Sequence, residues 1–506
     1  MSAIHLNLSR EDFVALSRDA NLIPVFTELA ADFETPLSAF QKLTDETPAF
    51  LFESAEMNDH AGRYSFLGTN PTAVLVARGS EVTITEEGGD KATVIESKDP
   101  LRTLEDFMAK FRPAPDDALP LFHGGAVGYL SYDMVRVFEP SISAPPPDQI
   151  GAPEMIFMVA DSVVIFDHRF RKIQIVANAF TERFDDPGLA YDAASETIAT
   201  IIERLSRPFK SQPLEAFSDP VESSDDAALQ ARSNTTQAEY EAMVVKAKEY
   251  ISAGDIFQVV PSQRFEVEFD AEPFNLYRAL RHVNPSPYMF FLKLPDDLHV
   301  VGSSPEVHVR AIEGKIEIRP IAGTRWRGRT PEEDDALADE LLADPKERAE
   351  HIMLVDLARN DVGRASEFSS VEVDDLMIIE RYSHVMHIVS NVTGRLAEGC
   401  SSYDVMRATF PAGTVSGSPK IRAMQIINEL EKSKRGVYAG AVGYFGFDGN
   451  LDSSIALRTC VLKDGKAYVQ AGAGVVADSD PTYEYEETCN KAAAILRALR
   501  RAAELA

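Results

Sequence analysis

The chain has 506 residues, with 45% hydrophobic and 26% charged side chains and a formal net charge of −30 at pH 7. This length and composition predict a globular protein with two or more domains. The negative charge argues against nucleic acid or an anionic membrane as a partner, because both bind positively charged surfaces. The N-terminus lacks a secretion-signal pattern, no run of 18 apolar residues occurs, and the three cysteines match no disulfide or zinc pattern. We therefore expect a cytoplasmic protein.

Strand-like runs and helical stretches alternate in the first part of the chain. The apolar, β-branched run at 156–166 predicts a strand, and residues 187–205 predict a helix. A stretch rich in Pro, Ser and Asp at 206–235 then indicates a linker or a surface crossing. After it, the capping-box pattern Thr236-Gln-Ala-Glu239 opens a helix that should end at Gly254.

The second part of the chain alternates groups of predicted strands with helices. The strands are expected at 256–265, 287–294, 299–311, 315–322, 380–396, 437–447, 453–463 and 467–476. Turn-like pairs such as Asp464-Gly465 separate neighbouring strands and favour antiparallel pairing, so the fold class is predicted as α+β. The sequence Gly-Ala-Val-Gly-Tyr occurs at 125–129 and again at 440–444, which suggests two sheets of related design packed together.

The helix expected near the C-terminus carries acidic side chains on its apolar face. Pro481 suits a first helical position, and the helical period then aligns Glu484, Glu487 and Lys491 with the apolar Ile495. Acidic residues in a first turn also complement the helix dipole, so this pattern alone favours no metal site.

A second helix, beginning at Pro345, has the same pattern. Glu347, Glu350 and His351 share a face with the apolar Leu354. Ionised carboxylates are rarely buried unless they are paired or bind a metal, so the two helices predict either a shared cation or a salt bridge with His351 or Lys491. The spacing leaves both alternatives open. A ligand set made of oxygen atoms would favour Mg²⁺ over zinc.

A glycine-rich strand precedes the C-terminal helix. Glycines in the segment 469–476 allow backbone amides to approach a ligand closely. The apolar run 453–462 places Arg458 within a strand, where its guanidinium could bind a carboxylate through two hydrogen bonds. Thr324 and neighbouring turn amides stand at the end of another strand. Each pattern also occurs at ordinary packing sites.

Together these motifs resemble those of the chorismate-binding enzymes over residues 236–495, and the whole chain resembles component I of anthranilate synthase. The matching segments are 254–262, 302–306, 320–324, 350–361, 410–420 and 487–491. The resemblance implies two packed, largely antiparallel β-sheets with helices on the outside. It also implies a regulatory, tryptophan-binding domain at 1–235, interleaved with the core, and a catalytic chorismate-binding domain at 236–506.

The resemblance also implies roles for individual residues. Glu350 and Glu487, with Glu484 close by, would hold Mg²⁺. Glu306 would be the general acid for the departing 4-hydroxyl group. His387 and Thr414 would line the reacting ring, although His387 could alternatively be an ordinary core histidine. The implied substrate contacts are Gly323, Thr324, Tyr438, Arg458, Gly472, Ala473, Gly474 and Lys491.

Two positions bear on the choice between sister activities. Related isochorismate synthases carry a lysine that activates water where this chain has the neutral Gln258, so ammonia is the expected nucleophile. Aminodeoxychorismate synthases typically carry a lysine where this chain has Ala322. The resemblance therefore implies conversion of chorismate and ammonia, through 2-amino-2-deoxyisochorismate, to anthranilate and pyruvate, the first step of tryptophan biosynthesis. The alternatives are an aminodeoxychorismate synthase large subunit and a catalytically inactive, tryptophan-sensing subunit.

The N-terminal part resembles the regulatory portion of this family. The segments 51–54 and 284–289 match the two lips of a pocket for L-tryptophan, the feedback inhibitor. Glu53 would receive the amino group of tryptophan, and the neighbouring pocket residues would be Ser54, Pro287, Tyr288 and Met289. The chain has no Gly-x-Cys-x-Gly nucleophile turn. Use of glutamine would therefore require a separate glutamine amidotransferase subunit in a hetero-oligomer, whereas free ammonia could serve without it.

Overall fold

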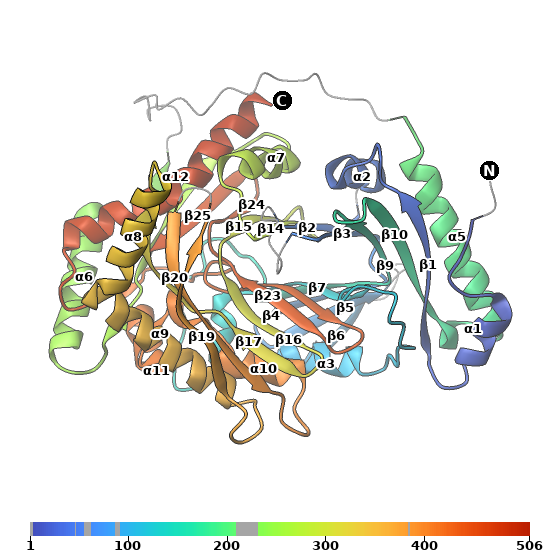
Figure 1. Cartoon of the computed structure of the whole chain (residues 1–506), viewed down its shortest axis with the longest axis horizontal. Helices are drawn as coiled ribbons and strands as arrows, with labels where there is room; N and C mark the ends of the chain where they lie inside the picture. The colour runs from blue at the N-terminus through green and yellow to red at the C-terminus, as the bar shows by residue number, and fades with distance from the viewer. Residues whose placement is uncertain are drawn as a thin grey trace.

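The computed structural model contains two large β-sheets that pack face to face, with helices on their outer surfaces (Figure 1). It describes residues 4–45, 47–54, 62–86, 92–208, 231–382 and 385–505. Side chains from both sheets meet in a core between them, where Phe50, Tyr129 and Phe290 are fully buried. Two further cores lie between the sheets and the covering helices. The predicted α+β fold of two packed sheets is confirmed.

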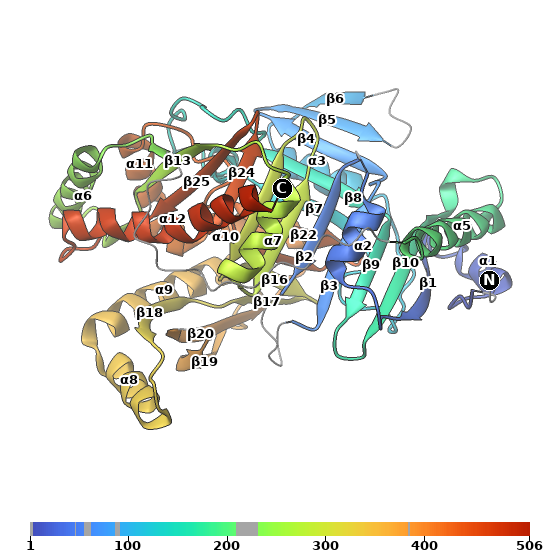
Figure 2. The ribbon, with the colours of Figure 1, turned by 90° about the horizontal axis from the view of Figure 1, so that it is seen from above.

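The first sheet has eleven strands within the described residues, and neighbouring strands are antiparallel. In spatial order they are β1 (Leu22–Ala30), β10 (Lys172–Phe180), β9 (Ser162–Asp167), β3 (Tyr64–Thr69), β2 (Ala49–Glu53), β14 (Tyr288–Lys293), β15 (His299–Ser304), β24 (Thr459–Lys463), β25 (Lys466–Gly472), β13 (Ser262–Glu268) and β11 (Arg232–Ser233). The helices on its outer side, seen from above in Figure 2, are α1 (Arg10–Leu16), α2 (Pro36–Leu43), α5 (Pro187–Leu205), α7 (Pro273–Val283) and α12 (Pro481–Glu504).

The second sheet has twelve strands within the described residues and is also antiparallel. In spatial order they are β18 (Ile321–Trp326), β20 (Val385–Arg395), β17 (Lys315–Ile318), β16 (Val307–Ile312), β23 (Leu451–Ile455), β22 (Ala441–Gly446), β7 (Gly125–Leu130), β8 (Met155–Ala160), β4 (Ala73–Arg78), β5 (Glu81–Glu86) and β6 (Ala92–Glu96), with β19 (Glu372–Arg381) paired to β20. A separate pair joins β12 (Gln258–Val259) to β21 (Gly417–Ser418).

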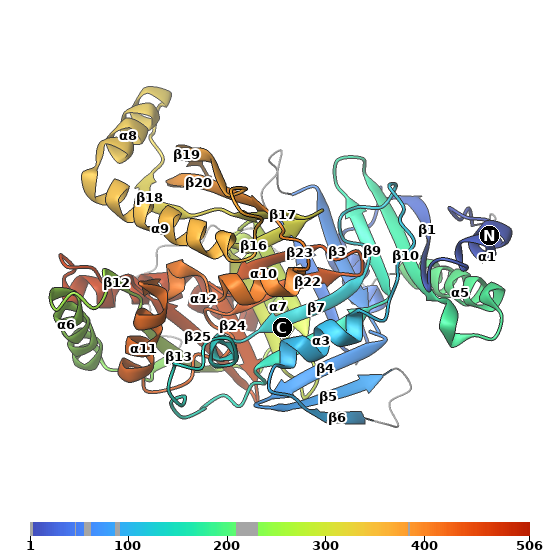
Figure 3. The ribbon, with the colours of Figure 1, turned by 90° about the horizontal axis from the view of Figure 1, so that it is seen from below.

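Helices also cover the second sheet, as Figure 3 shows from below. The remaining α-helices are α3 (Pro100–Met108), α4 (Val135–Phe138), α6 (Gln237–Ser252), α8 (Pro331–Ala343), α9 (Pro345–Gly363), α10 (Ser402–Thr409) and α11 (Lys420–Leu430). The predicted capping box at Thr236 is present, since its hydroxyl accepts from the backbone of Glu239 and the Glu239 side chain accepts from Thr236 N–H. No helix in the described part of the chain is both long and apolar enough to span a membrane.

Each sheet contains a block of strands from the first part of the chain beside a block from the second part. In the first sheet β2 pairs with β14, and in the second sheet β7 pairs with β22. The repeated Gly-Ala-Val-Gly-Tyr segments are β7 and β22 themselves, so they are neighbours in one sheet and not in two related sheets as predicted. Most of the predicted linker, residues 209–230, lies outside the described residues.

Three segments predicted as single strands each form two strands, one in each sheet. The runs 156–166, 299–311 and 453–463 break at Asp161, at Pro305-Glu306 and at 456–458. Polar residues and Pro305 interrupt these runs, but the sequence does not show that the chain passes to the other sheet there, because strand partners are set by packing between distant segments. The prediction that Arg458 lies within a strand is therefore wrong. Arg458 lies in the crossing from β23 to β24 and has a left-handed backbone, with φ of 45°.

Candidate active site

The two crossings that carry Glu306 and Arg458 run side by side between the sheets. The backbone N–H of Ile455 donates to the carbonyl of Glu306 at 3.1 Å, and that of Ser303 donates to the carbonyl of Arg458, also at 3.1 Å. These bonds continue the β15–β24 and β16–β23 pairings across the gap between the sheets. An acidic and a basic residue thus lie on adjacent, mutually bonded segments.

Glu306 is a buried carboxylic acid, with 7% of its surface exposed. Burial raises the pKa of Glu306 to about 7, although a hydrogen bond from Thr414 acts in the opposite direction. Thr414 Oγ1 donates that bond to Oε1 at 2.6 Å. A carboxyl group with this pKa is substantially protonated near neutral pH and can donate a proton. The predicted pair of Glu306 and Thr414 is therefore brought together.

Arg458 is a mostly buried cation without a carboxylate partner among the described residues. Its Nη1 donates to Asn284 Oδ1 at 3.2 Å, and burial lowers its pKa. Because an ionised group is rarely buried without compensation, the guanidinium is suited to an anionic ligand.

His387 lies on β20 beside Thr324 of β18, at a bulge in the pairing of the two strands. Its Nδ1 is 2.8 Å from the carbonyl oxygen of Gly323 and 3.1 Å from Thr324 Oγ1. Because a carbonyl only accepts, Nδ1 carries the proton. Burial lowers the pKa of His387, and the nearby Arg458 lowers it further. The ring is therefore a neutral imidazole.

The three predicted metal-binding glutamates approach one another from α9 and α12. Burial raises the pKa of Glu484 and that of Glu350, and the negative charge of Glu487 raises both further. Lys491 Nζ pairs with Glu487 at 2.7 Å and donates to the Gly472 carbonyl at 3.1 Å. His351, the other predicted salt-bridge partner, instead contacts Ser390 Oγ at 2.7 Å.

The Gly472-Ala473-Gly474 turn lies against two polar side chains. A Cβ on Gly472 would lie 2.8 Å from Tyr438 Oη, and one on Gly474 would lie 3.0 Å from Gln258 Nε2. Gln258 Nε2 also donates to Glu350 Oε1 at 3.1 Å. A Cβ at Gly472 would also lie 2.8 Å from the Pro261 carbonyl oxygen, so glycine is required there, and the Gly472-Ala473-Gly474 segment is connected to the acidic cluster through Gln258.

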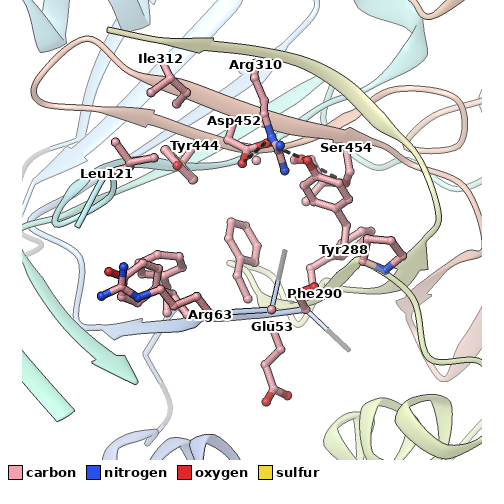
Figure 4. A pocket seen from close by; sticks show the side chains of 18 of the residues that line it. Glu53, Arg63, Leu121, Tyr288, Phe290, Arg310, Ile312, Tyr444, Asp452 and Ser454 are labelled. Atoms are coloured by element: carbon pink, nitrogen blue, oxygen red, sulfur yellow. Dashed lines mark hydrogen bonds and ion pairs between the residues drawn. The ribbon is translucent and has the colours of Figure 1, made fainter. Parts of the chain in front are cut away.

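A separate cavity of about 620 Å³ opens between the two sheets (Figure 4). The residues predicted for the tryptophan pocket all line it: Glu53, Ser54, Pro287, Tyr288 and Met289. On the opposite wall Arg310 Nε lies 3.2 Å from Asp452 Oδ2, and Tyr288 Oη donates to Asp452 Oδ1 at 3.1 Å.

The Glu53 carboxylate points out of this cavity, as Figure 4 shows. Tyr277 Oη donates to its Oε2 at 2.7 Å, and Arg281 Nε lies 3.1 Å from the same atom. In this orientation Glu53 does not offer the predicted acceptor for an amino group. Among the described residues, the other acidic side chains that line the cavity are Glu313, Glu317 and Asp452.

Comparison with known proteins shows the family of the chain. The family model described as chorismate binding enzyme matches residues 47–497. The chain belongs to the chorismate-binding enzyme family. Anthranilate synthase component 1 of Aquifex aeolicus (strain VF5) is 50% identical over 99% of both chains. The protein of the same name from Acetivibrio thermocellus is 48% identical over 97% of this chain and 98% of its own.

Solved structures of the chorismate-binding family agree with the fold. Anthranilate synthase component I from Streptococcus pneumoniae TIGR4 superposes with a TM-score of 0.75 at 38% identity, covering 92% of this chain and 98% of its own. MenF, the menaquinone-specific isochorismate synthase from Escherichia coli, has a TM-score of 0.69 at 18% identity and covers 97% of this chain and 98% of its own. The similarity to MenF supports the fold alone.

The acidic cluster of this chorismate-binding chain has the donor chemistry for Mg²⁺. The described residues contain no group of three or more His, Cys, Asp or Glu side chains already arranged around a metal position. The carboxylates nevertheless fit a hard cation, because the charge of Glu487 raises the pKa of both Glu350 and Glu484 and Glu487 itself binds the Lys491 ammonium.

Sequence reasoning missed two residues that the structure brings to these sites. Asn284 orients Arg458, and Asp452 holds Arg310 in the wall of the cavity. Asn284 was noted only as part of a matching motif. A carboxylate at the second position of the strand Leu451–Ile455 was a signal for Asp452, since charges are depleted in buried strands.

Proposed function

We propose that this chain is the catalytic subunit of an anthranilate synthase, which converts chorismate and ammonia to anthranilate and pyruvate with Mg²⁺ and is inhibited by tryptophan. The observation that supports it most directly is the pairing of a protonatable Glu306 with a neighbouring segment that carries the uncompensated Arg458. Chorismate needs both, because it carries carboxylates and must lose a hydroxyl group.

Arg458 and the Gly472-Ala473-Gly474 turn would hold the carboxylates of chorismate. The guanidinium supplies parallel N–H donors, and the glycines let a ligand approach the backbone closely. Mg²⁺ held by Glu350, Glu484 and Glu487 would neutralise a second carboxylate of the substrate in this acidic protein. Asn284 keeps the guanidinium aimed at the site.

Glu306 would act as the general acid. As ammonia forms a bond to C2, both conjugated ring double bonds shift by one position and the C4–O bond breaks. Glu306 protonates the departing hydroxyl to water, and the added nitrogen loses a proton to solvent. Thr414 keeps the carboxyl oriented through its 2.6 Å hydrogen bond. Loss of pyruvate from the 2-amino-2-deoxyisochorismate so formed then gives anthranilate.

Ammonia is the proposed nucleophile because no base stands where water would need one. Gln258 is a neutral amide that already donates to Glu350, and Ala322 has no functional group. The name component 1 of the relatives supports a partner that supplies ammonia from glutamine. Tryptophan would bind in the cavity between the sheets, where Asp452 could accept from its amino group.

The test is product identification with the purified chain, chorismate, Mg²⁺ and ammonium, with and without tryptophan. We expect fluorescent anthranilate, equimolar pyruvate and suppression by tryptophan. Accumulation of aminodeoxychorismate would instead assign the p-aminobenzoate branch. Absence of turnover with tryptophan still bound would indicate a sensing subunit without catalysis. Glu306→Gln, which keeps the shape of the side chain but donates no carboxyl proton, is the matched control.

A further inference from the structure

A buried ion pair lies behind the candidate active site. Arg435 and Glu431, which are 2% and 8% exposed, form a fork in which Arg435 Nε lies 2.9 Å from Glu431 Oε2 and Nη2 lies 2.6 Å from Oε1. Neither residue is among those predicted to contact substrate. A buried pair adds little stability in general, because desolvation offsets much of the attraction. The other contacts of Arg435 and Glu431 therefore indicate the role of the pair.

The remaining donors of Arg435 bind backbone carbonyls of two distant segments. Nη1 donates to the carbonyl of Val415 at 2.7 Å, and Nη2 donates to that of Val260 at 2.6 Å. Val415 directly follows Thr414, the donor to Glu306. It ends a 3₁₀ turn (Gly413–Val415), outside both large sheets. One guanidinium thus fixes a carbonyl that no strand pairing of the large sheets holds.

Glu431 connects the same centre to the glycine turn. Its Oε1 accepts from the backbone N–H of Ser262 at 2.9 Å and from Ser262 Oγ at 2.7 Å. Ser262 is the register partner of Gly472, and the carbonyl of the adjoining Pro261 accepts from Ala473 N–H at 3.2 Å. The position of the Gly472-Ala473 backbone therefore depends on where Glu431 holds Ser262.

The flat face of the Arg435 guanidinium also packs against Tyr438, one of the residues predicted to contact substrate. Its guanidinium carbon lies 5.6 Å from the ring centre of Tyr438 and 4.6 Å from that of Tyr132, within the range of cation–π attraction. The Tyr438 hydroxyl in turn borders Gly472. Three parts of the site therefore meet at one side chain: the Thr414 turn, the glycine turn and Tyr438.

We propose that Arg435, held by Glu431, is a positioning residue that sets the spacing between the Thr414–Glu306 acid and the Gly472-Ala473 substrate turn. It touches neither substrate nor the reacting atoms. Its role depends on the planar fork of arginine, since a lysine ammonium could keep the ion pair but could not reach Glu431, Val260 and Val415 together. The inference rests on the proposed function for its kinetic readout.

The test compares Arg435→Lys with Arg422→Lys on helix α11. Arg422 also forms an ion pair, with Asp255 at 2.7 Å, and lies 5.1 Å from the Tyr250 ring centre, but it is at the surface. We expect kcat/KM for chorismate to fall about 10- to 100-fold in Arg435→Lys, with native near-UV circular dichroism, and to stay within about 2-fold in Arg422→Lys. The alkaline limb of the pH profile of Arg435→Lys should move to higher pH, because a loosened Thr414 no longer lowers the pKa of Glu306.

A second variant, Ser262→Ala, removes the hydroxyl link to Glu431 together with the acceptor of Gln470 Nε2, and guards against a folding defect in Arg435→Lys. A fall in its kcat/KM with unchanged unfolding free energy would support the proposal. Wild-type kcat/KM and an unmoved alkaline limb in folded Arg435→Lys would overturn it, as would activity losses in both variants that merely follow the unfolded fraction. If the wild-type chain itself shows no turnover, the proposed function fails, and the dissociation constant for chorismate serves as the readout here.

Discussion

Asn284 Oδ1 accepts a 3.2 Å hydrogen bond from Nη1 of Arg458. This bond joins the candidate substrate site to the segment 284–289, part of which lines the cavity of about 620 Å³ between the sheets. Asn284 follows the end of helix α7 and is three residues before Pro287 in the cavity wall. It also holds Ser303 through a bond of 3.2 Å from its side-chain amide. A shift of the 284–287 segment would therefore move the acceptor that orients Arg458.

Asn284→Ala should weaken chorismate binding by removing this acceptor. Loss of one hydrogen bond to a charged group costs about 1.5–3 kcal/mol, so we expect KM for chorismate to rise roughly 10- to 100-fold. Steady-state kinetics at saturating ammonium would measure it. Asn275→Ala, on the same helix with a 3.4 Å bond to the Leu505 carbonyl, is the control and should leave KM near the wild-type value. Equal KM values in wild type and Asn284→Ala would show that Arg458 needs no orienting group.

Glu306→Gln should abolish turnover, because the amide donates no proton to the departing hydroxyl. In the wild-type enzyme, kcat/KM at a fixed concentration of free ammonia should fall as pH rises through about 7, where burial and Thr414 set the pKa of Glu306. Stopped-flow or steady-state profiles from pH 6 to 9 would test this. A flat profile over that range would exclude Glu306 as the acid.

The same substitution should change how stability depends on pH. The pKa of Glu306 is raised on folding, so its favourable contribution is present below its ordinary pKa and is lost as pH rises through about 7. The wild-type free energy of unfolding should therefore fall by roughly 2–3 kcal/mol from pH 5 to pH 8 through this group, a fall that Glu306→Gln should lack. Urea titrations at both pH values measure the difference, and parallel pH dependences in the two proteins would contradict it.

Glu487→Gln should weaken Mg²⁺ binding and remove Mg²⁺-supported turnover. The change deletes a carboxylate that repels Glu350 and Glu484 and that holds Lys491 at 2.7 Å. Titration calorimetry with Mg²⁺ alone gives a readout independent of catalysis. Its neighbour Glu486 is exposed on the outer side of α12, so Glu486→Gln is the matched control. Wild-type Mg²⁺ affinity in Glu487→Gln would refute the metal assignment.

Ser54→Phe should relieve inhibition by tryptophan, because the added ring would occupy part of the cavity between the sheets. We expect the tryptophan concentration for half inhibition to rise at least about 10-fold, the loss expected for roughly 1.4 kcal/mol of binding energy. The rate of each variant with tryptophan is divided by its own rate without it. Ser80→Phe, at an exposed turn before β5, is the comparison. An unchanged inhibition curve for Ser54→Phe would show that tryptophan binds elsewhere in the molecule.

The local patterns of the chain were sufficient to predict its helices and several contacts. The capping box at Thr236, the start of α12 at Pro481 and the inward direction of Glu484 follow from residue spacing within one or two helical turns. These features depend on neighbours along the chain, so the sequence alone determined them.

Only the tertiary structure decided where the chain changes from one sheet to the other. The segments 299–311 and 453–463 each divide between the two sheets, and the divisions place Glu306 and Arg458 on adjacent segments. The direction of the Glu53 carboxylate was likewise set by Tyr277 and Arg281, more than 200 residues away. The hydrophobic pattern of a sequence indicates which residues are buried. Which residues they pack against depends on contacts between strands that are distant in the sequence.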